Sequence, residues 1–260
     1  LVMNADSAID EDLRATLRSR TLLESNENLQ YWYERLFERM FRCEPNLADK
    51  VILEIGSGSS PLKRVIPRVI TSDVMPLNYL DHVFDCHEID RYAGIEDRSV
   101  DIIVMTNVLH HLRDPLQFLK NAQSKLRPGG KVIMAEPYFS ALSYPIYKLL
   151  HHEPVDFSIR APLLENILGP LSSSNQAMPH MIFFSRPDWL AQLGSAYDLE
   201  GTRLEYFSSL SYVMTGGISR RLPIPRQLYR LIFPMDAWLA DNAPRIFASF
   251  FVATLLTHNS

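Results

Sequence analysis

Short apolar runs, in which polar residues do not alternate with hydrophobic ones, predict the strands of this chain. They are Val51–Glu54, Val69–Ser72, Val100–Thr106 and Lys131–Ala135, with a shorter run at Val83–Phe84. Such runs are typical of strands that a parallel sheet buries on both faces. We therefore expect an α/β fold.

A different spacing, with apolar residues three and four positions apart, predicts helices. Leu29–Phe41 shows it most clearly, and a shorter helix is expected over Asp10–Leu23. Asp114 and Pro115 fit the N-cap and first position of a helix that continues to Leu126. Only a stubby helix fits between Pro61 and Ile66.

The later half of the chain changes character. From Tyr138 to about Glu200 prolines and aromatic residues are frequent, with short helical pieces at Ile146–Leu150 and Pro187–Leu193. This stretch is too long for a plain connection inside a compact domain. Thr202–Val213 and Phe247–Thr257 are expected to form a final antiparallel pair of strands.

The segment between these two strands is rich in arginine and aromatic residues. Arg226, Tyr229, Arg230, Phe233 and Trp238 are expected to share a basic aromatic surface. Such a surface fits a helix packed on the core, and it also fits contact with a membrane surface or a lipid-linked substrate.

Two glycines follow the first strand and point to a nucleoside cofactor. Gly56 and Gly58 come directly after Glu54 and Ile55, and Asp73 ends the second strand. Glycine lets the backbone approach a ligand closely, and a carboxylate at the tip of the next strand can accept ribose hydroxyls. A dinucleotide fingerprint needs a third glycine, which is absent, and Glu54 would repel a pyrophosphate. A positively charged ligand suits Glu54 better.

At these residues the chain resembles the class I S-adenosylmethionine-dependent methyltransferases, whose first motif reads [D/E]-x-G-x-G-x-G. Glu54, Gly56, Gly58 and Asp73 match, and Ser60 replaces the last glycine. The order of strand, His110–His111 loop, helix, L-R-P-G-G and strand resembles the second half of the same core. The resemblance implies a doubly wound, mostly parallel seven-stranded sheet with an antiparallel edge strand, N-terminal helices and a helical cap insertion.

The same resemblance divides the chain. It implies a single methyltransferase domain over residues 1–260, with N-terminal helices at 1–45, a cofactor-binding core at 46–137, a cap insertion at 138–200, and C-terminal strands at 201–260 that carry an insertion at 216–244.

The resemblance also implies S-adenosyl-L-methionine as cofactor. Glu54 and the backbone at Gly56 to Gly58 would receive its methionine moiety, Asp73 its ribose, and Asp85 or Cys86 its adenine. Asp90 is an alternative at the adenine, and Met75 fits the ring face. The complete set expected at the cofactor is Glu54, Ile55, Gly56, Ser57, Gly58, Asp73, Val74, Met75, Asp85, Cys86, Asn107 and Val108.

Methyl transfer chiefly requires that the protein hold donor and acceptor close together and exclude water from the site. A hydroxyl acceptor also benefits from a base near neutral pKa, such as histidine. His111, Glu136 and His152 are the candidates for catalysis. His110 and Tyr138 are also expected near the strand exits, and His151 is expected beside His152 in the cap. For the His110–His111 pair, packing beneath the helix is an equally ordinary role. No metal is expected, because the magnesium-dependent branch places acids where Asn107 and Pro137 stand.

Composition narrows the partners. The chain has 260 residues, 47% of them hydrophobic and 22% charged, and its net charge of −4 argues against nucleic acid. Cys43 and Cys86 fit a reducing compartment, and neither a signal peptide nor a membrane-spanning run is apparent, so a cytoplasmic location is expected.

We therefore expect a methyltransferase that acts on a small-molecule, sugar or lipid-linked acceptor, with O-methylation as the favoured reaction. The alternatives are an NAD-dependent oxidoreductase and a catalytically silent S-adenosylmethionine-binding protein. The sequence leaves the oligomeric state open.

Overall fold

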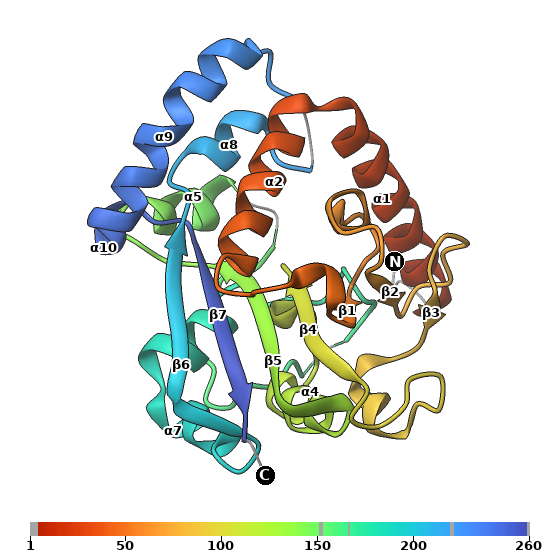
Figure 1. The fold of residues 1–260 in the computed structure, drawn as a ribbon. Coiled ribbons are helices and arrows are strands. Elements are labelled where there is room, and N and C mark those ends of the chain that lie inside the picture. The colour runs from red at the N-terminus through yellow and green to blue at the C-terminus, as the bar shows by residue number, and fades with distance from the viewer. Residues whose placement is uncertain (1–4, 151–152, 166, 219–220, 259–260) are drawn as a thin grey trace.

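Seven strands form one sheet in the order β3-β2-β1-β4-β5-β7-β6 (Figure 1). The computed structural model describes residues 5–150, 153–165, 167–218 and 221–258. The strands are β1 (Ile52–Ile55), β2 (Ile70–Asp73), β3 (His82–Val83), β4 (Val100–Thr106), β5 (Leu126–Pro137), β6 (Tyr197–Phe207) and β7 (Phe250–Thr257). The predicted doubly wound, mostly parallel architecture is confirmed.

The first five strands run parallel, and β7 alone runs antiparallel to its neighbours. It pairs with β5, as Lys131 with Leu256, and with β6, as Phe207 with Phe250. The antiparallel strand therefore lies one place in from the edge, and β6 is outermost. The carboxyl ends of β1, β2 and β4 meet at one side of the sheet, where ligands bind in this kind of fold.

The expected strand over Thr202–Val213 is wrong beyond Phe207. Ser208 has a positive φ of 59°, which breaks the extended backbone. The following residues turn into the short helix α8 (Ser211–Thr215), because the buried carboxylate of Asp236 accepts hydrogen bonds from three successive amides, those of residues 209 to 211.

The helices lie on both faces of the sheet. Their bounds are α1 (Ala5–Ser25), α2 (Glu27–Phe41), α3 (Leu62–Val65), α4 (Pro115–Ala122), α5 (Ser143–Leu150), α6 (Ala177–His180), α7 (Pro187–Leu190), α9 (Arg226–Asn242) and α10 (Pro244–Phe247). The expected helix start at Asp114 and Pro115 is confirmed, and α2 begins with a cap that was not predicted. Asn26 accepts from the amide of Leu29 at the start of α2, and Asp114 accepts from that of Gln117 before Pro115.

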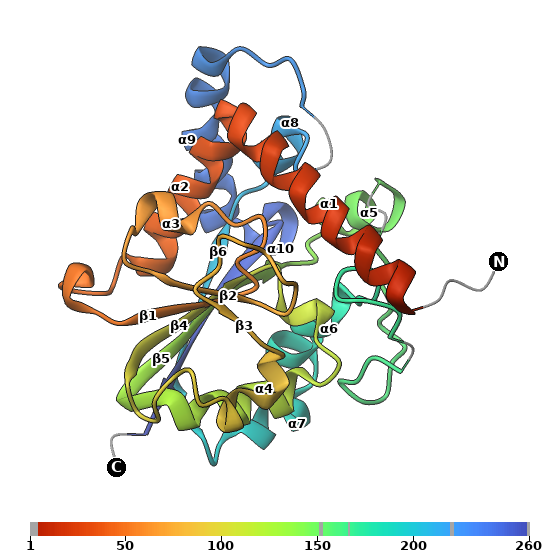
Figure 2. The same cartoon turned by 90° about the vertical axis from the view of Figure 1, so that its right-hand side faces the viewer.

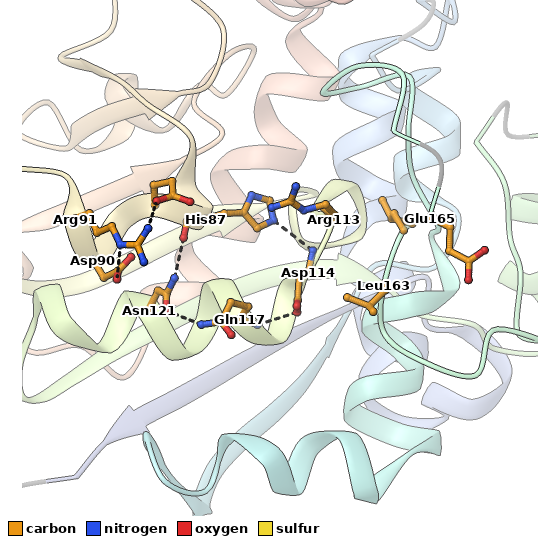
Figure 3. A pocket seen from close by; sticks show the side chains of 11 residues that line it. His87, Asp90, Arg91, Arg113, Asp114, Gln117, Asn121, Leu163 and Glu165 are labelled. Carbon is orange, nitrogen blue, oxygen red and sulfur yellow. Dashed lines mark hydrogen bonds and ion pairs between the residues drawn. The ribbon is translucent and has the colours of Figure 1, made fainter. Parts of the chain in front are cut away.

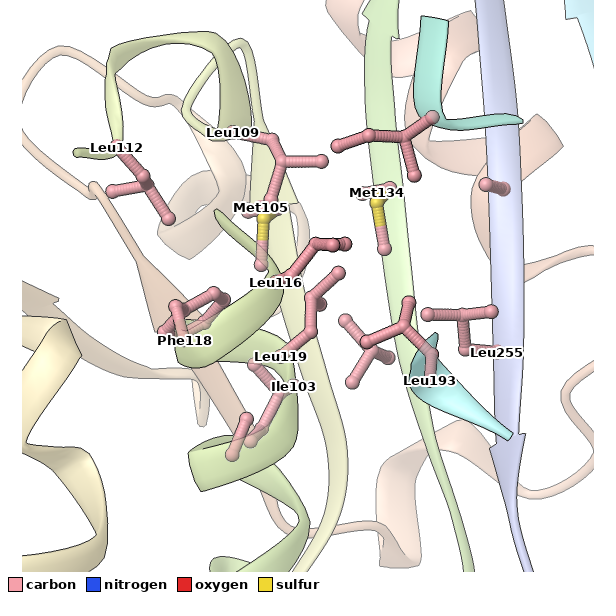
Figure 4. Close-up of a cluster of buried hydrophobic side chains, with 14 of the residues drawn as sticks. Ile103, Met105, Leu109, Leu112, Leu116, Phe118, Leu119, Met134, Leu193 and Leu255 are labelled. Atoms are coloured by element: carbon pink, nitrogen blue, oxygen red, sulfur yellow. The ribbon is translucent and has the colours of Figure 1, made fainter. Parts of the chain in front are cut away.

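Successive side chains along the central strands point to opposite faces of the sheet, so the hydrophobic core has two parts. On one face Leu53, Ile103 and Met134 pack with α4, whose side chains Leu116 and Leu119 are buried (Figure 4). On the other face the neighbouring strand residues pack with α2, α3 and α9, with Trp32 among the largest fully buried side chains. Figure 2 shows the sheet nearly edge-on between these layers, with α1 crossing over the strand ends.

The stretch after β5 serves two purposes. Residues 177–193 carry α6 and α7, and their apolar side chains belong to the same core face as α4. Only the part from Pro137 to Gln176 contributes to the cavity described below. The predicted insertion is thus partly a core layer of the sheet.

The basic aromatic surface expected on α9 is only partly right. Tyr229 and Phe233 are buried against Tyr31 of α2, whereas Trp238 is exposed. Leu231 and Met235 are exposed as well, so α9 presents an apolar stripe outward and its aromatic pair inward. Within the described residues, no helix is long and apolar enough to cross a membrane.

Candidate cofactor and active site

A cavity of about 1680 Å³ opens at the carboxyl ends of the parallel strands. It begins at the glycine turn after β1, passes the ends of β2 and β4, and reaches the loop after β5. Its wall is completed by α1, by α5, and by α8 with the residues that follow it. A single space therefore connects the predicted cofactor site with the predicted catalytic histidines.

Glu54 lies beneath the glycine turn, buried to 1% exposure. Its Oε1 accepts a hydrogen bond of 2.5 Å from the Ser60 hydroxyl, while none of the described residues donates to its buried Oε2. Burial raises the pKa of Glu54 to about 7, and the hydrogen bonds from Ser60 and Ser57 only partly oppose this. A buried carboxylate with one unsatisfied oxygen fits a cationic ligand. Ser60, which stands where the motif has its last glycine, therefore orients Glu54 through this hydrogen bond.

The two glycines are required where the backbone passes the cavity. Gly56 has a φ of +74°, and a Cβ there would overlap the side chain of Val108. A Cβ at Gly58 would lie 2.8 Å from Thr16 Cγ2 and 3.0 Å from Asp73 Oδ2. The turn therefore lies so close to Val108, Thr16 and Asp73 that only glycine fits at these two positions.

Asp73 ends β2 and faces the cavity. Its Oδ2 accepts from the amide of Gly58 at 3.0 Å, and its Oδ1 accepts from that of Met75 at 3.0 Å. Each carboxylate oxygen keeps a second lone pair, so the fixed carboxylate can still accept two ribose hydroxyls. Burial raises the pKa of Asp73, and the backbone hydrogen bonds counter it.

The predicted adenine side lies next to Asp73. Val74, Met75, Asp85 and Cys86 line the cavity. One carboxylate oxygen of Asp85 is already engaged, because Oδ1 accepts hydrogen bonds from both the amide and Nδ1 of His87. Burial raises the pKa of the Cys86 thiol, so this thiol stays protonated.

The alternative adenine residue, Asp90, lies elsewhere. It lines a separate pocket of about 490 Å³ between the loop after β3 and α4, together with Gln117 and Asn121 (Figure 3). Asp90 does not line the large cavity.

Helix α1 forms part of the cofactor wall, which the sequence did not reveal. Thr16 donates to the sulfur of Met75 at 3.6 Å, and Arg20 stacks on Tyr79 with its Cζ 3.9 Å from the ring centroid. The Tyr79 hydroxyl in turn donates to the carbonyl of Gly58 at 2.6 Å. The amphipathic pattern of α1 predicted a helix here, but only the tertiary structure shows that it covers the turn.

At the far end of the cavity His110 is held between two glutamates. Its Nδ1 lies 2.6 Å from Glu136 Oε2 and its Nε2 lies 3.2 Å from Glu153 Oε2. Burial alone would lower the pKa of His110, but the two carboxylates outweigh it and raise the pKa to about 10. His110 is therefore an imidazolium in this arrangement.

His111 is oriented differently. Its Nδ1 donates to the carbonyl of Ser173 at 3.1 Å, since a carbonyl can only accept, which leaves the lone pair on Nε2, 3.7 Å from Glu153 Oε1. Burial and the positive charge of His110 lower the pKa of His111 to about 4. The ring is therefore neutral, with an available nitrogen at the cavity wall.

Glu136, one of the candidates for catalysis, does not line the cavity. It is fully buried, and its Oε1 accepts from the amides of Val108 and Leu109 at 2.9 and 2.7 Å. With Oε2 on His110, both of its oxygens are engaged, so Glu136 holds the histidine loop in place. A direct part of Glu136 in catalysis stays a prediction from the sequence.

The remaining predicted residues fall into three groups. Those that line the cavity are Ile55, Gly56, Gly58, Asp73, Val74, Met75, Asp85, Cys86, Asn107, Val108 and His111. Glu54 and Ser57 lie beneath the turn, and Ser57 Oγ donates to the carbonyl of Glu54. His152 lies outside the described residues. Glu153, which was not singled out, lines the cavity beside His111.

Comparison with known proteins identifies the family. A family model described as a methyltransferase domain matches residues 25–203. A probable S-adenosylmethionine-dependent methyltransferase from Mycolicibacterium smegmatis is 30% identical over 123 residues, which cover 41% of this chain and 46% of that protein. A ubiquinone biosynthesis O-methyltransferase from Parvibaculum lavamentivorans is 29% identical over 103 residues, 34% of this chain and 40% of that protein.

Solved structures show the same fold. A Haemonchus contortus phosphoethanolamine N-methyltransferase 2 aligns over 99% of this chain and 61% of its own, with a TM-score of 0.55 and 10% identity. A Thermotoga maritima protein titled a possible histamine N-methyltransferase aligns over 93% and 99%, with a TM-score of 0.50 and 12% identity. This chain spans less than half the length of the curated relatives that it matches.

Proposed function

The chain belongs to the methyltransferase domain family, and from this premise we propose that it transfers a methyl group from S-adenosylmethionine to an oxygen atom of an acceptor with an apolar portion. The cofactor expected from the sequence is that of the family. The acceptor, whether a small molecule, a sugar or a lipid-linked compound, and the choice of oxygen are parts of the proposal.

One observation carries the proposal: a single cavity leads from the glycine turn to His111 and Glu153. Its volume of about 1680 Å³ exceeds the roughly 300–1,000 Å³ of ordinary small-molecule sites, so it has room for a donor and an acceptor together. A reaction between two bound molecules needs such a shared space.

The residues fit the donor at one end. Glu54 would face its positively charged methionine portion, Asp73 would accept the ribose hydroxyls, and Met75 with Cys86 would border the adenine. When bound, S-adenosylmethionine supplies a methyl group activated by a positively charged sulfur. The protein contributes by holding that group in line with the acceptor and by excluding water.

The other end suits an oxygen acceptor. His111 Nε2 is unprotonated and can accept a hydrogen bond from an acceptor hydroxyl, and the Glu153 carboxylate lies next to it. The similarity to an O-methyltransferase agrees with oxygen as the acceptor atom.

The mouth of the cavity favours an acceptor with an apolar body. Ile9, Leu149, Ile167 and Leu168 line the cavity and yet are exposed, Leu149 to 76%. Exposed apolar side chains around an opening are typical of sites that take up an apolar ligand. A lipid-linked acceptor or a small molecule with a hydrocarbon portion would cover them.

Calorimetry with the purified chain tests the donor. We expect micromolar binding of S-adenosylmethionine, weakened by about tenfold or more in Asp73→Ala because the ribose loses its acceptor. Asp90→Ala, which changes the separate pocket, is the control and should bind as the wild type does. Binding of NAD in place of S-adenosylmethionine would support the oxidoreductase alternative.

Incubation of cell extract with methyl-labelled donor tests transfer. Mass spectrometry should find a labelled compound that partitions into organic solvent and whose label sits on oxygen. Donor binding without any labelled product, in extracts that supply small molecules and lipids, would identify a silent binding protein.

A further inference from the structure

We propose that His110, His111 and Glu153 bind a divalent transition-metal ion at the acceptor end of the large cavity. The role of the ion in holding the acceptor rests on the proposed function, whereas its binding does not. Nothing in the sequence pattern indicated this site, because Glu153 lies more than forty residues after the histidines and comes from another segment.

The ligand atoms of the three residues converge. One atom from each, a ring nitrogen of each histidine and a carboxylate oxygen, lie within 4.8 Å of one another. His110 Nε2 lies 3.2 Å from Glu153 Oε2, and His111 Nε2 lies 3.7 Å from the other oxygen, Oε1. Ligands bound at about 2.0–2.2 Å in a tetrahedral or octahedral shell lie roughly 3–3.5 Å apart, so small side-chain movements close the site.

The second ring nitrogen of each histidine is already held by an acceptor. His110 Nδ1 contacts Glu136 at 2.6 Å, and His111 Nδ1 contacts the carbonyl of Ser173 at 3.1 Å. Metal-binding histidines are commonly oriented by a carboxylate or backbone carbonyl on the nitrogen away from the ion. Both rings therefore present Nε2 to the same carboxylate.

Glu136 gives this arrangement a rigid base. It is fully buried, and the amides of Val108 and Leu109 fix its other oxygen. An orienting carboxylate of this kind fixes the ring and increases the basicity of the liganding nitrogen. The burial of Glu136 suits it to this positioning role.

The donor set selects the ion. Two imidazoles and one carboxylate favour zinc, iron(II) or manganese(II) over magnesium and calcium, which prefer oxygen ligands alone. Binding replaces the proton that His110 shares with Glu153, because an imidazole must be neutral to be a ligand. The half-buried Glu153 carboxylate then faces the doubly charged ion, and the buried Glu136 stays on the far nitrogen of His110.

Three protein ligands leave coordination positions open, and all three residues line the cavity. An acceptor oxygen that enters the cavity could fill one of these positions, and this contact would replace the hydrogen bond to His111 Nε2 that the site offers without the ion. The site thus specifies the class of acceptor: a compound whose oxygen donor, a hydroxyl, phenol or carboxylate, lies near the atom that is methylated.

Titration of chelator-treated protein with cobalt(II), zinc(II) and magnesium(II) tests the proposal. We expect about one zinc or cobalt ion per chain, a cobalt absorption spectrum of nitrogen and oxygen ligands without thiolate charge transfer, and much weaker binding of magnesium. Glu153→Gln and His111→Ala should each weaken zinc binding by about tenfold or more.

The control variant is Asp85→Asn. Asp85, Cys86 and His87 form the other converging group of potential ligands found among the described residues, and Asp85→Asn should leave zinc binding unchanged. Loss of the ion in Asp85→Asn with retention in Glu153→Gln would overturn the proposal, as would a thiolate spectrum with cobalt.

The same samples are titrated with S-adenosylmethionine in the absence of metal. Retained donor binding shows that Glu153→Gln and His111→Ala are folded, because both residues lie away from the cofactor end of the cavity, and a far-ultraviolet circular dichroism spectrum shows the same for Asp85→Asn. Wild-type protein that binds the donor but no transition metal refutes the metal site and leaves the proposed function standing. Protein that binds the metal but not the donor refutes the proposed function and supports the metal site.

Discussion

At the scale of single residues, Glu54 is the group that we expect to select a positively charged ligand at the proposed cofactor site. It is buried with one oxygen unpartnered among the described residues, and its pKa is raised from 4.5 to about 7. The folded chain without ligand therefore retains a proton on Glu54 that the unfolded chain loses. A negative charge on Glu54 lowers the free energy of unfolding unless a cationic ligand is bound beside it. Ligand binding and stability should therefore both depend on pH through this residue.

Glu54→Gln should separate these two effects. Since the folded pKa is raised, the contribution of Glu54 to the free energy of unfolding falls as pH rises from about 4.5 to about 7. The free energy of unfolding of the ligand-free variant, relative to that of the wild type, should therefore increase by up to about 3 kcal/mol between pH 4.5 and pH 8. Urea unfolding at both pH values measures it.

The exposed Glu34→Gln serves as the control and should show the same difference at both pH values. The wild type should bind S-adenosylmethionine more tightly at pH 8 than at pH 6, and Glu54→Gln should bind about tenfold more weakly at pH 8. Equal affinity of the two proteins at pH 8 would show that Glu54 does not recognise the charge of the donor.

At the scale of elements, α1 is tied to the far side of the cavity through one carboxylate. Asp12 is buried, its Oδ2 accepts from the amides of Leu171 and Ser172 at 2.8 and 3.1 Å, and its Oδ1 accepts from the Ser172 hydroxyl at 2.7 Å. The helix that covers the glycine turn is thereby joined to the segment that borders the acceptor end.

Asp12→Ala should release this contact. We expect faster proteolysis near residues 169–172 and donor binding weakened about two- to tenfold, because the wall over the cofactor is less fixed. Limited proteolysis with mass spectrometry and calorimetry measure the two effects. Asp10→Ala, an exposed position on the same helix, should change neither.

A second element depends on Asp236 of α9, which caps α8. Its carboxylate accepts from the amides of Ser209, Leu210 and Ser211 at 2.6 to 3.1 Å. Asp236→Ala leaves these donors without a partner and should lower the free energy of unfolding by about 2–4 kcal/mol. Asp241→Ala, which removes an exposed ion pair with Arg39, should cost below about 1 kcal/mol in the same urea unfolding measurement.

At the scale of the whole molecule, local patterns predicted the sheet and the cofactor end. The strands that contain Glu54 and Asp73, and the glycine turn between them, are specified by residues that are adjacent in the sequence. The acceptor end could not be predicted in this way. Glu153 meets His110 only through tertiary folding, and the end of β6 is decided by Asp236, almost thirty residues further along.

Donor binding should stabilise the molecule as a unit, since the cavity joins elements from both halves of the chain. At a donor concentration of about 100 times the Kd, the expected gain is about 2.7 kcal/mol, or an increase in Tm of about 5–10 °C for a domain of this size. Differential scanning fluorimetry measures it. Asp73→Ala at the same donor concentration should show only a small part of this shift, and NAD should produce none.

The position of β7 has a consequence for biosynthesis. This strand comes last in chain order among those described, yet it lies between β5 and β6. During translation, β5 therefore has one unpaired edge and β6 has no partner strand until residue 257 has left the ribosome. The unfinished chain therefore presents the unpaired edge of β5 and the unpaired strand β6 to other chains, which makes this stage the natural point of chaperone dependence and of aggregation.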